Sequence, residues 1–170
     1  KGAFPEFNTA FAADALVKIL RAEIVKTGLK KAVLGVSGGV DSALSLALAV
    51  QALGKENVRA VMMPYKTSNP DSLGDARKLC EKFGVPTEVV EITAMADAYF
   101  ARDESITATR KGNVMARLRM ITLYDISARD GSLVVGTVWA LGWATLTVGH
   151  LNILSATFAV IFIALSNESQ

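Results

Sequence analysis

The sequence predicts an α/β domain in which helices flank a parallel β-sheet. Short apolar runs such as residues 31–36 (KAVLGV) are typical of strands that are buried on both faces. Stretches with apolar side chains at helical spacing separate these runs, and strands that alternate with helices favour a parallel sheet. The predicted strands are residues 31–36, 58–63, 87–92 and 132–136, and the predicted helices are residues 9–27, 42–53, 69–83 and 106–129.

The helix signals are strongest where a cap, an apolar face and a glycine follow one another. In the third predicted helix Asn69 can cap the N-terminus, Pro70 suits the first turn, and Gly84 follows the apolar face. The first two predicted helices are also followed by glycines, and the fourth has Val114, Leu118 and Ile121 on one side. A proline ends the second predicted strand.

The composition indicates one globular domain spanning residues 1–170. Of 170 residues, 51% are hydrophobic and 20% are charged, which excludes a disordered chain. The net charge of +2 is too small for an electrostatic nucleic-acid surface, so we expect no nucleic-acid partner. One cysteine, Cys80, and one histidine, His150, exclude an intramolecular disulfide and a cysteine or multi-histidine metal cluster. This suits a reducing compartment, and we expect a cytoplasmic location. Residues 1–10 are expected to be a tag or a disordered lead.

The most informative stretch, residues 35–43 (GVSGGVDSA), lies between a predicted buried strand and a predicted helix. Ligands of open α/β sheets bind at the carboxyl ends of strands. Gly38 and Gly39 allow a tight turn and a close approach of the backbone to a ligand. The N–H groups at the start of the following helix favour an anion, and Ser37 and Ser42 add hydroxyl donors.

Asp41 narrows the chemistry of this loop. No lysine follows the glycines as in a Walker loop, and the GxGxxG dinucleotide pattern is absent. A carboxylate beside a phosphate is repulsive unless a cation lies between them, so Asp41 predicts Mg²⁺. The alternative is that Asp41 and Ser42 only cap a helix. We prefer a phosphate site because two serines, two glycines and an acid occur together.

Four motifs carry a resemblance to a known family. SGGVDS, residues 37–42, resembles the SGGxDS loop of ATP pyrophosphatases, which GMP synthetases, asparagine synthetases and RNA-thiolating enzymes share. MPYKTSNPDSLGDA, residues 63–76, and RKGNVMARLRMITLYDISA, residues 110–128, resemble two blocks of the ammonia-dependent NAD synthetases. With LVVGT, residues 133–137, the resemblance covers roughly residues 12–137.

The resemblance implies a doubly wound fold of the adenine nucleotide α-hydrolase type. It implies ATP-dependent amidation of deamido-NAD (nicotinate adenine dinucleotide) to NAD with ammonia, through an adenylated intermediate and with release of AMP and pyrophosphate. It assigns Asp41 to Mg²⁺ and Asn113 and Arg117 to deamido-NAD, and it assigns no catalytic residue. The implied ATP-binding residues are Gly35, Val36, Ser37, Gly38, Gly39, Val40, Asp41, Ser42 and Thr137.

Asn113 and Arg117 are four residues apart and therefore share one helix face. Such a pair can bind a phosphate or carboxylate. The alternative is that Arg110, Lys111, Arg117 and Arg119 form a solvated helix surface. Arg119 is expected to point elsewhere than Arg117.

The chain departs from the family pattern after residue 137. Gly142 stands where the family has a glutamate that is a second metal ligand, so we expect weak turnover or none. No Asp, Glu, Lys or Arg occurs in residues 131–167. Our first interpretation is an incomplete or altered chain, and the second is a hydrophobic core or homodimer interface. A membrane segment ranks last, because the apolar run of residues 151–165 is shorter than the ~20 residues that span a bilayer.

Two other functions stay open. Another ATP pyrophosphatase, such as a GMP synthetase-like or RNA-thiolating enzyme, would share the SGGVDS loop but not the KGNxxARxRM block. A nucleotide-binding domain without turnover would bind ATP and release no pyrophosphate.

Overall fold

The computed structural model describes residues 9–136 and contains a four-stranded parallel sheet. The strand order is β3-β2-β1-β4. The chain adds β2 and β3 on one side of β1 and then returns to add β4 on the other side, so the direction of strand addition reverses at β1. Ala32 in β1 pairs with Val58 in β2 on one side and with Leu133 in β4 on the other. The strands are β1 (Lys31–Gly35), β2 (Val58–Met62), β3 (Thr87–Val89) and β4 (Ser132–Val134).

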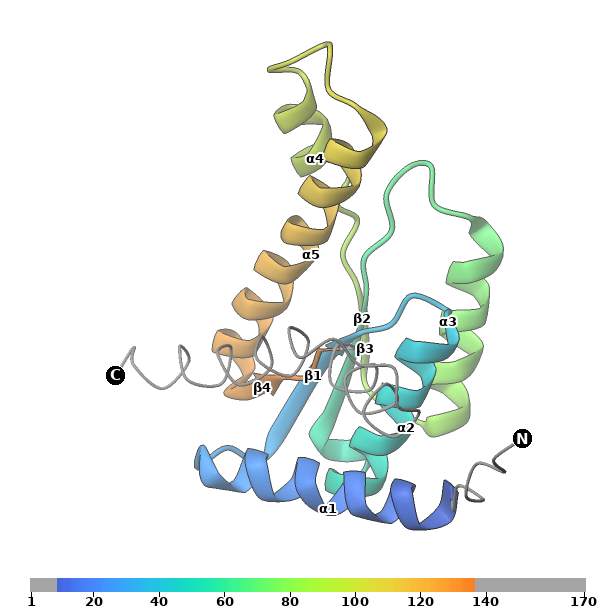
Figure 1. The fold of residues 1–170 in the computed structure, drawn as a ribbon, viewed down its shortest axis with the longest axis vertical. Coiled ribbons are helices and arrows are strands. Elements are labelled where there is room, and N and C mark those ends of the chain that lie inside the picture. The colour runs from blue at the N-terminus through green and yellow to red at the C-terminus, as the bar shows by residue number, and fades with distance from the viewer. Residues whose placement is uncertain (1–8, 137–170) are drawn as a thin grey trace, which may run out of the picture.

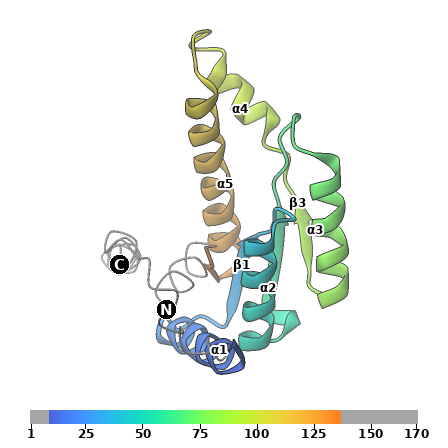
Figure 2. The same ribbon diagram turned by 45° about the vertical axis from the view of Figure 1, so that its right-hand side comes forward.

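Helices cover both faces of this sheet (Figures 1 and 2), which confirms the predicted doubly wound α/β fold. Helices α2 and α3 lie on one face and α5 on the other, while α1 packs against α2 and α4 against α5. The helices are α1 (Thr9–Lys26), α2 (Val40–Leu53), α3 (Pro70–Phe83), α4 (Thr93–Phe100) and α5 (Ala108–Asp130), with a short 3-10 helix η1 (Lys55–Asn57).

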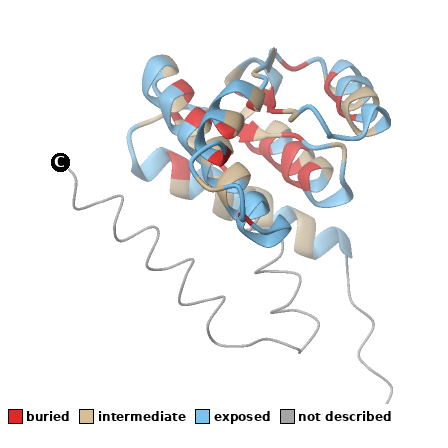
Figure 3. Ribbon diagram, turned by 90° about the horizontal axis from the view of Figure 1, so that it is seen from above, coloured by how far each residue is buried: buried red, intermediate tan, exposed pale blue. Residues whose placement is uncertain are grey.

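Alternate residues of β1 supply two separate cores. Leu34 packs with Leu46 of α2 under α1, α2 and α3. Val33 points to the other face and packs with Ile126 of α5. Seen from above, the buried residues gather between the layers and the outer helix faces are exposed (Figure 3). Burial on both faces explains why the central strands are continuous apolar runs.

The largest differences from the sequence prediction are at three elements, and the fourth strand also ends two residues earlier than predicted, at Val134. The third strand is shorter than predicted and ends at Val89, although the backbone N–H groups of Val90 and Ile92 still donate to the carbonyls of Met62 and Pro64. Helix α4 and the 3-10 helix η1 were not predicted. Helix α4 has no side-chain cap. It is stabilised by burial of Ala96 and Phe100 against α5 and against Ile106 in the loop that precedes α5.

None of the helices within residues 9–136 is both long enough and apolar enough to cross a membrane. The expectations for residues 1–8, including most of the lead segment, and for residues 137–170 lie outside the described residues. Thr9 and Ala10 already belong to α1.

Candidate functional site

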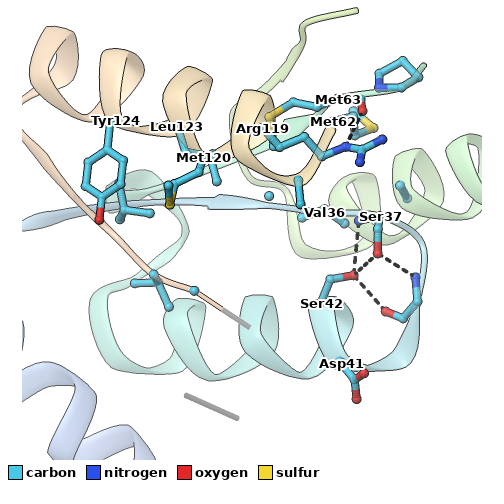
Figure 4. A pocket seen from close by; sticks show the side chains of 18 of the residues that line it. Val36, Ser37, Asp41, Ser42, Met62, Met63, Arg119, Met120, Leu123 and Tyr124 are labelled. Atoms are coloured by element: carbon cyan, nitrogen blue, oxygen red, sulfur yellow. Dashed lines mark hydrogen bonds between the residues drawn. The ribbon is translucent and has the colours of Figure 1, made fainter. Parts of the chain in front are cut away.

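A cavity of about 1000 Å³ opens at the end of β1, beside the point where the strand order reverses (Figure 4). Its walls come from the loop after β1, the first turns of α2 and α3, the inner side of α5, and β4, with part of α1. Of the residues predicted to bind ATP, the lining includes Gly35, Val36, Ser37, Gly39, Asp41 and Ser42. A ligand site at the switch point of a parallel sheet is what this fold favours.

The two serines of the loop are joined by hydrogen bonds. The Ser37 backbone N–H donates to Ser42 Oγ over 3.2 Å, and Ser42 Oγ donates to the Gly39 carbonyl over 2.8 Å. The two hydroxyl oxygens are 3.2 Å apart. Gly39 is the N-cap of α2 and provides no capping side chain, so the first N–H groups of α2 are available to an anion.

Gly38 cannot be replaced by a larger residue without strain. Its φ is +83°, in the left-handed region, and an added Cβ would lie 2.2 Å from the backbone oxygen of Ser72 in the first turn of α3. The loop therefore turns directly against α3, and this contact fixes where Ser37 and Gly39 lie.

Asp41 lies in the first turn of α2 and its exposed carboxylate borders the cavity. One carboxylate beside the predicted phosphate-binding loop fits Mg²⁺, which takes one or two carboxylates together with phosphate oxygens and water. Within residues 9–136 no group of three or more His, Cys, Asp or Glu side chains could hold a metal ion by itself. The donor set thus fits a metal that arrives with a nucleotide.

Arg119 of α5 lines the same cavity, although the sequence prediction did not place it there. Its Nε donates to the Met63 carbonyl at the end of β2, over 3.0 Å. A signal was available, because Met115, Arg119 and Leu123 are spaced by four residues, and both neighbours pack into the core beside the sheet. Helical spacing therefore places Arg119 on the inner face of α5.

Asn113 and Arg117 lie on α5, are exposed, and are not among the residues that line the cavity. They are close to each other, since Arg117 Nη1 donates to the Asn113 carbonyl over 3.0 Å. The structure therefore brings these two residues together but not next to the loop that follows β1. Thr137, predicted to contact ATP, and Gly142 lie outside the described residues.

A cluster of polar side chains fixes the loop between β2 and α3. Tyr65 Oη donates to one oxygen of Asp97 over 2.8 Å, and Lys66 Nζ donates to the other over 2.6 Å. The Lys66 backbone N–H donates to Thr93 Oγ1 over 2.9 Å. The hydrogen bond from Lys66 holds the pKa of Asp97 below its usual range, so Asp97 is a carboxylate. This cluster joins α4 to a loop whose later residue, Ser68, lines the cavity.

Comparison with known proteins gives the family. The family model described as NAD synthase matches residues 12–150. The chain belongs to the NAD synthase family. This confirms the family resemblance seen in the sequence. The chain is 55% identical over 130 residues to an NH(3)-dependent NAD(+) synthetase of Chlorobium phaeobacteroides (strain BS1). The matched residues make up 76% of this chain and 47% of that relative.

Two solved structures of NAD synthetases resemble this fold. An NH3-dependent NAD synthetase from Campylobacter jejuni, in complex with the nitrate ion, has a TM-score of 0.73 and 37% identity, covering 77% of this chain and 57% of the other. A glutamine-dependent NAD+ synthetase from Acinetobacter baumannii, in complex with ADP, has a TM-score of 0.71 and 34% identity. This match covers 79% of this chain and 26% of the other. The chain thus spans about half the length of the curated relatives that it matches.

Proposed function

We propose that this chain carries the ATP-binding part of an ammonia-dependent NAD synthetase, which amidates deamido-NAD to NAD. The observation that carries the proposal is the loop at the end of β1, where Ser37, Gly39, Asp41 and Ser42 line one cavity. Family membership supports it, since relatives about half identical to the chain are named NH(3)-dependent NAD(+) synthetases.

The proposed reaction has two steps. A carboxylate oxygen of deamido-NAD attacks the α-phosphorus of ATP, the bond from that phosphorus to the bridging oxygen breaks, and pyrophosphate leaves. Ammonia then attacks the carbonyl carbon of the adenylate, the bond from that carbon to the AMP oxygen breaks, and one proton is released. Both steps depend on placing a phosphorus or carbon atom precisely against its attacking group.

The chain's own groups bind and orient the phosphates. The N–H groups at the start of α2 donate to phosphate oxygens. The Ser42 hydroxyl accepts from the Ser37 N–H and donates to the Gly39 carbonyl, and so holds the loop in shape. Gly38 holds this loop against α3, so the donors do not need to reorganise when the ligand binds. Asp41 would hold Mg²⁺, which when bound neutralises charge on the phosphate oxygens.

We propose Asn113 and Arg117 as contacts to deamido-NAD and Thr137 as a contact to ATP. Both α5 residues are exposed and adjacent, as a ligand arriving from outside the phosphate cavity would require. We also propose a homodimer. Its support is the sequence of residues 131–167, which contains no Asp, Glu, Lys or Arg, together with Ile121 of α5, which is 59% exposed and does not line the cavity. A cytoplasmic location is in keeping with the buried free thiol of Cys80.

The test is release of pyrophosphate from ATP by the 170-residue chain with Mg²⁺ and ammonium, with either deamido-NAD or xanthosine monophosphate as the acceptor. We expect release above background with deamido-NAD only. Its rate should lie below the usual enzyme range of about 1–10³ s⁻¹, because Gly142 replaces the expected second metal ligand. Equal release with both acceptors, or release without an acceptor, would contradict the proposal.

A further inference from the structure

The cavity has an unequal distribution of charge. Among the described residues that line it, Glu23 and Asp41 are acidic and Arg119 is the one positively charged residue. Glu23 is already paired with Lys26 on the same helix. Most of the remaining wall is apolar, including Met62, Met63 and Leu123. A guanidinium in such surroundings is poorly hydrated, so an anion that reaches it is attracted more strongly than at the protein surface.

The position of Arg119 is fixed by its neighbours. It projects from the inner face of α5, and its Nε donates to the Met63 carbonyl over 3.0 Å. In Figure 4 its guanidinium group lies beside Met63, on the side of the β1 end where Ser37 lies. One of five N–H donors of the guanidinium is used in this bond, which leaves the four on its two terminal nitrogens.

Arg119 has no ion-pair partner within residues 9–136. Other arginines in this part of the chain do, since Arg59 and Arg129 bind Asp130, and Arg110 binds Asp103. Burial lowers the pKa of the Arg119 guanidinium from its ordinary value. Arginine stays protonated in proteins, so the lowered pKa does not mean that Arg119 is neutral. It means that burial leaves the charged guanidinium less hydrated than at the surface.

We propose that Arg119 binds phosphate oxygens of ATP from the side of the cavity opposite α2. The inference rests on the ATP site of the proposed function and adds its positively charged residue. A phosphate suits the site because the Ser37–Ser42 loop places the first N–H groups of α2 at the same cavity, and a guanidinium fork matches two phosphate oxygens. The bond to Met63 holds that fork in place before the ligand arrives.

Three variants test this binding role. Arg119→Gln removes the charge but keeps an N–H donor for the Met63 carbonyl, and Arg119→Lys keeps the charge. Arg77→Gln is the control, because Arg77 is exposed on α3, outside the cavity lining, and its change removes the same charge. Binding of MgATP and of inorganic pyrophosphate is measured by calorimetry. The urea midpoint of each ligand-free variant shows whether the fold is retained.

We expect Arg119→Gln to weaken both ligands about 10- to 100-fold, the range for losing a hydrogen bond to a charged group. Arg119→Lys keeps the charge but loses the fork and the bond to Met63, so its loss should be measurable but smaller than that of Arg119→Gln. Arg77→Gln should stay within about twofold of the parent. Unchanged pyrophosphate binding in Arg119→Gln would overturn the proposal. So would an equal loss in the Lys and Gln variants, or a parent chain that binds neither ligand.

The result is separable from the proposed function. If Arg119→Gln weakens ATP binding but the parent releases no pyrophosphate with deamido-NAD, the Arg119 assignment stands and the synthetase function fails. If the parent releases pyrophosphate with deamido-NAD and Arg119→Gln binds ATP normally, the function stands and the Arg119 assignment fails.

Discussion

Replacing Gly38 by alanine tests whether the phosphate loop depends on its close contact with α3. The substitution has two effects. It places a side chain at φ +83°, and it places a Cβ atom 2.2 Å from the Ser72 backbone oxygen. Because this oxygen belongs to the main chain of α3, it cannot move aside as the end of a flexible side chain would.

Gly28 separates these two effects. Its φ is +76°, nearly that of Gly38, but an added Cβ would meet nothing within 4 Å. A non-glycine residue in the left-handed region costs about 1–2 kcal/mol, which is the whole expected loss for Gly28→Ala. Overpacking adds about 1–3 kcal/mol, so Gly38→Ala should lose about 2–5 kcal/mol of unfolding free energy.

Urea denaturation followed by circular dichroism measures the difference. Taking about 2 kcal/mol between the two variants and an m value of about 2 kcal/mol/M, the midpoint of Gly38→Ala should lie about 1 M below that of Gly28→Ala. Binding of MgATP should also weaken in Gly38→Ala and stay normal in Gly28→Ala. Equal midpoints would show that the contact with Ser72 does not constrain the loop, and the argument for a preorganised phosphate site would fail.

Three other changes give distinct results. Asp41→Asn should weaken calorimetric ATP binding at least about tenfold in Mg²⁺ but not in a chelator, because only the metal complex needs the carboxylate; equal loss in both contradicts the metal role. Arg117→Ala should weaken deamido-NAD binding by about 1.5–3 kcal/mol and leave ATP binding unchanged; parallel losses would indicate a structural role. The hydrogen bond from Arg129 lowers the pKa of Glu88 from its ordinary value of 4.5. The charged Glu88 therefore stabilises the fold above pH 4.5, and this stabilisation is lost as the pH falls through the lowered pKa of Glu88. The stability difference between the parent and Glu88→Gln should therefore shrink between about pH 7 and about pH 3 in urea titrations, and a constant difference would contradict this.

The sequence predicts those elements whose ends have local chemical causes. Helix α3 begins after Asn69, whose side chain accepts from the Asp71 N–H, and ends before Gly84, whose φ is +62°. The shape of the loop after β1 has local causes as well, since Ser42 Oγ accepts from the Ser37 N–H and donates to the Gly39 carbonyl.

Features that depend on tertiary packing could not be predicted in this way. Helix α4 has eight residues and no side-chain cap, and it exists because Ala96 and Phe100 are buried against other elements. The sequence also gives no means of telling how far Arg117 lies from the phosphate loop. That depends on the direction in which α5 leaves the sheet, with Arg119 facing the cavity and Arg117 facing away from it.

Helix α4 connects this packing to the site, and Asp97 is the residue that makes the connection. Its carboxylate accepts from Tyr65 and Lys66, at the start of the loop that leads to the cavity. Asp97→Ala should free this loop and weaken MgATP binding about twofold to tenfold, although Asp97 itself does not line the cavity. Asp103→Ala is the matched control, because Asp103 is bound to Arg110 and not to the loop. If calorimetry gives both variants the same affinity for MgATP, the contacts of Asp97 hold α4 in place without positioning the site.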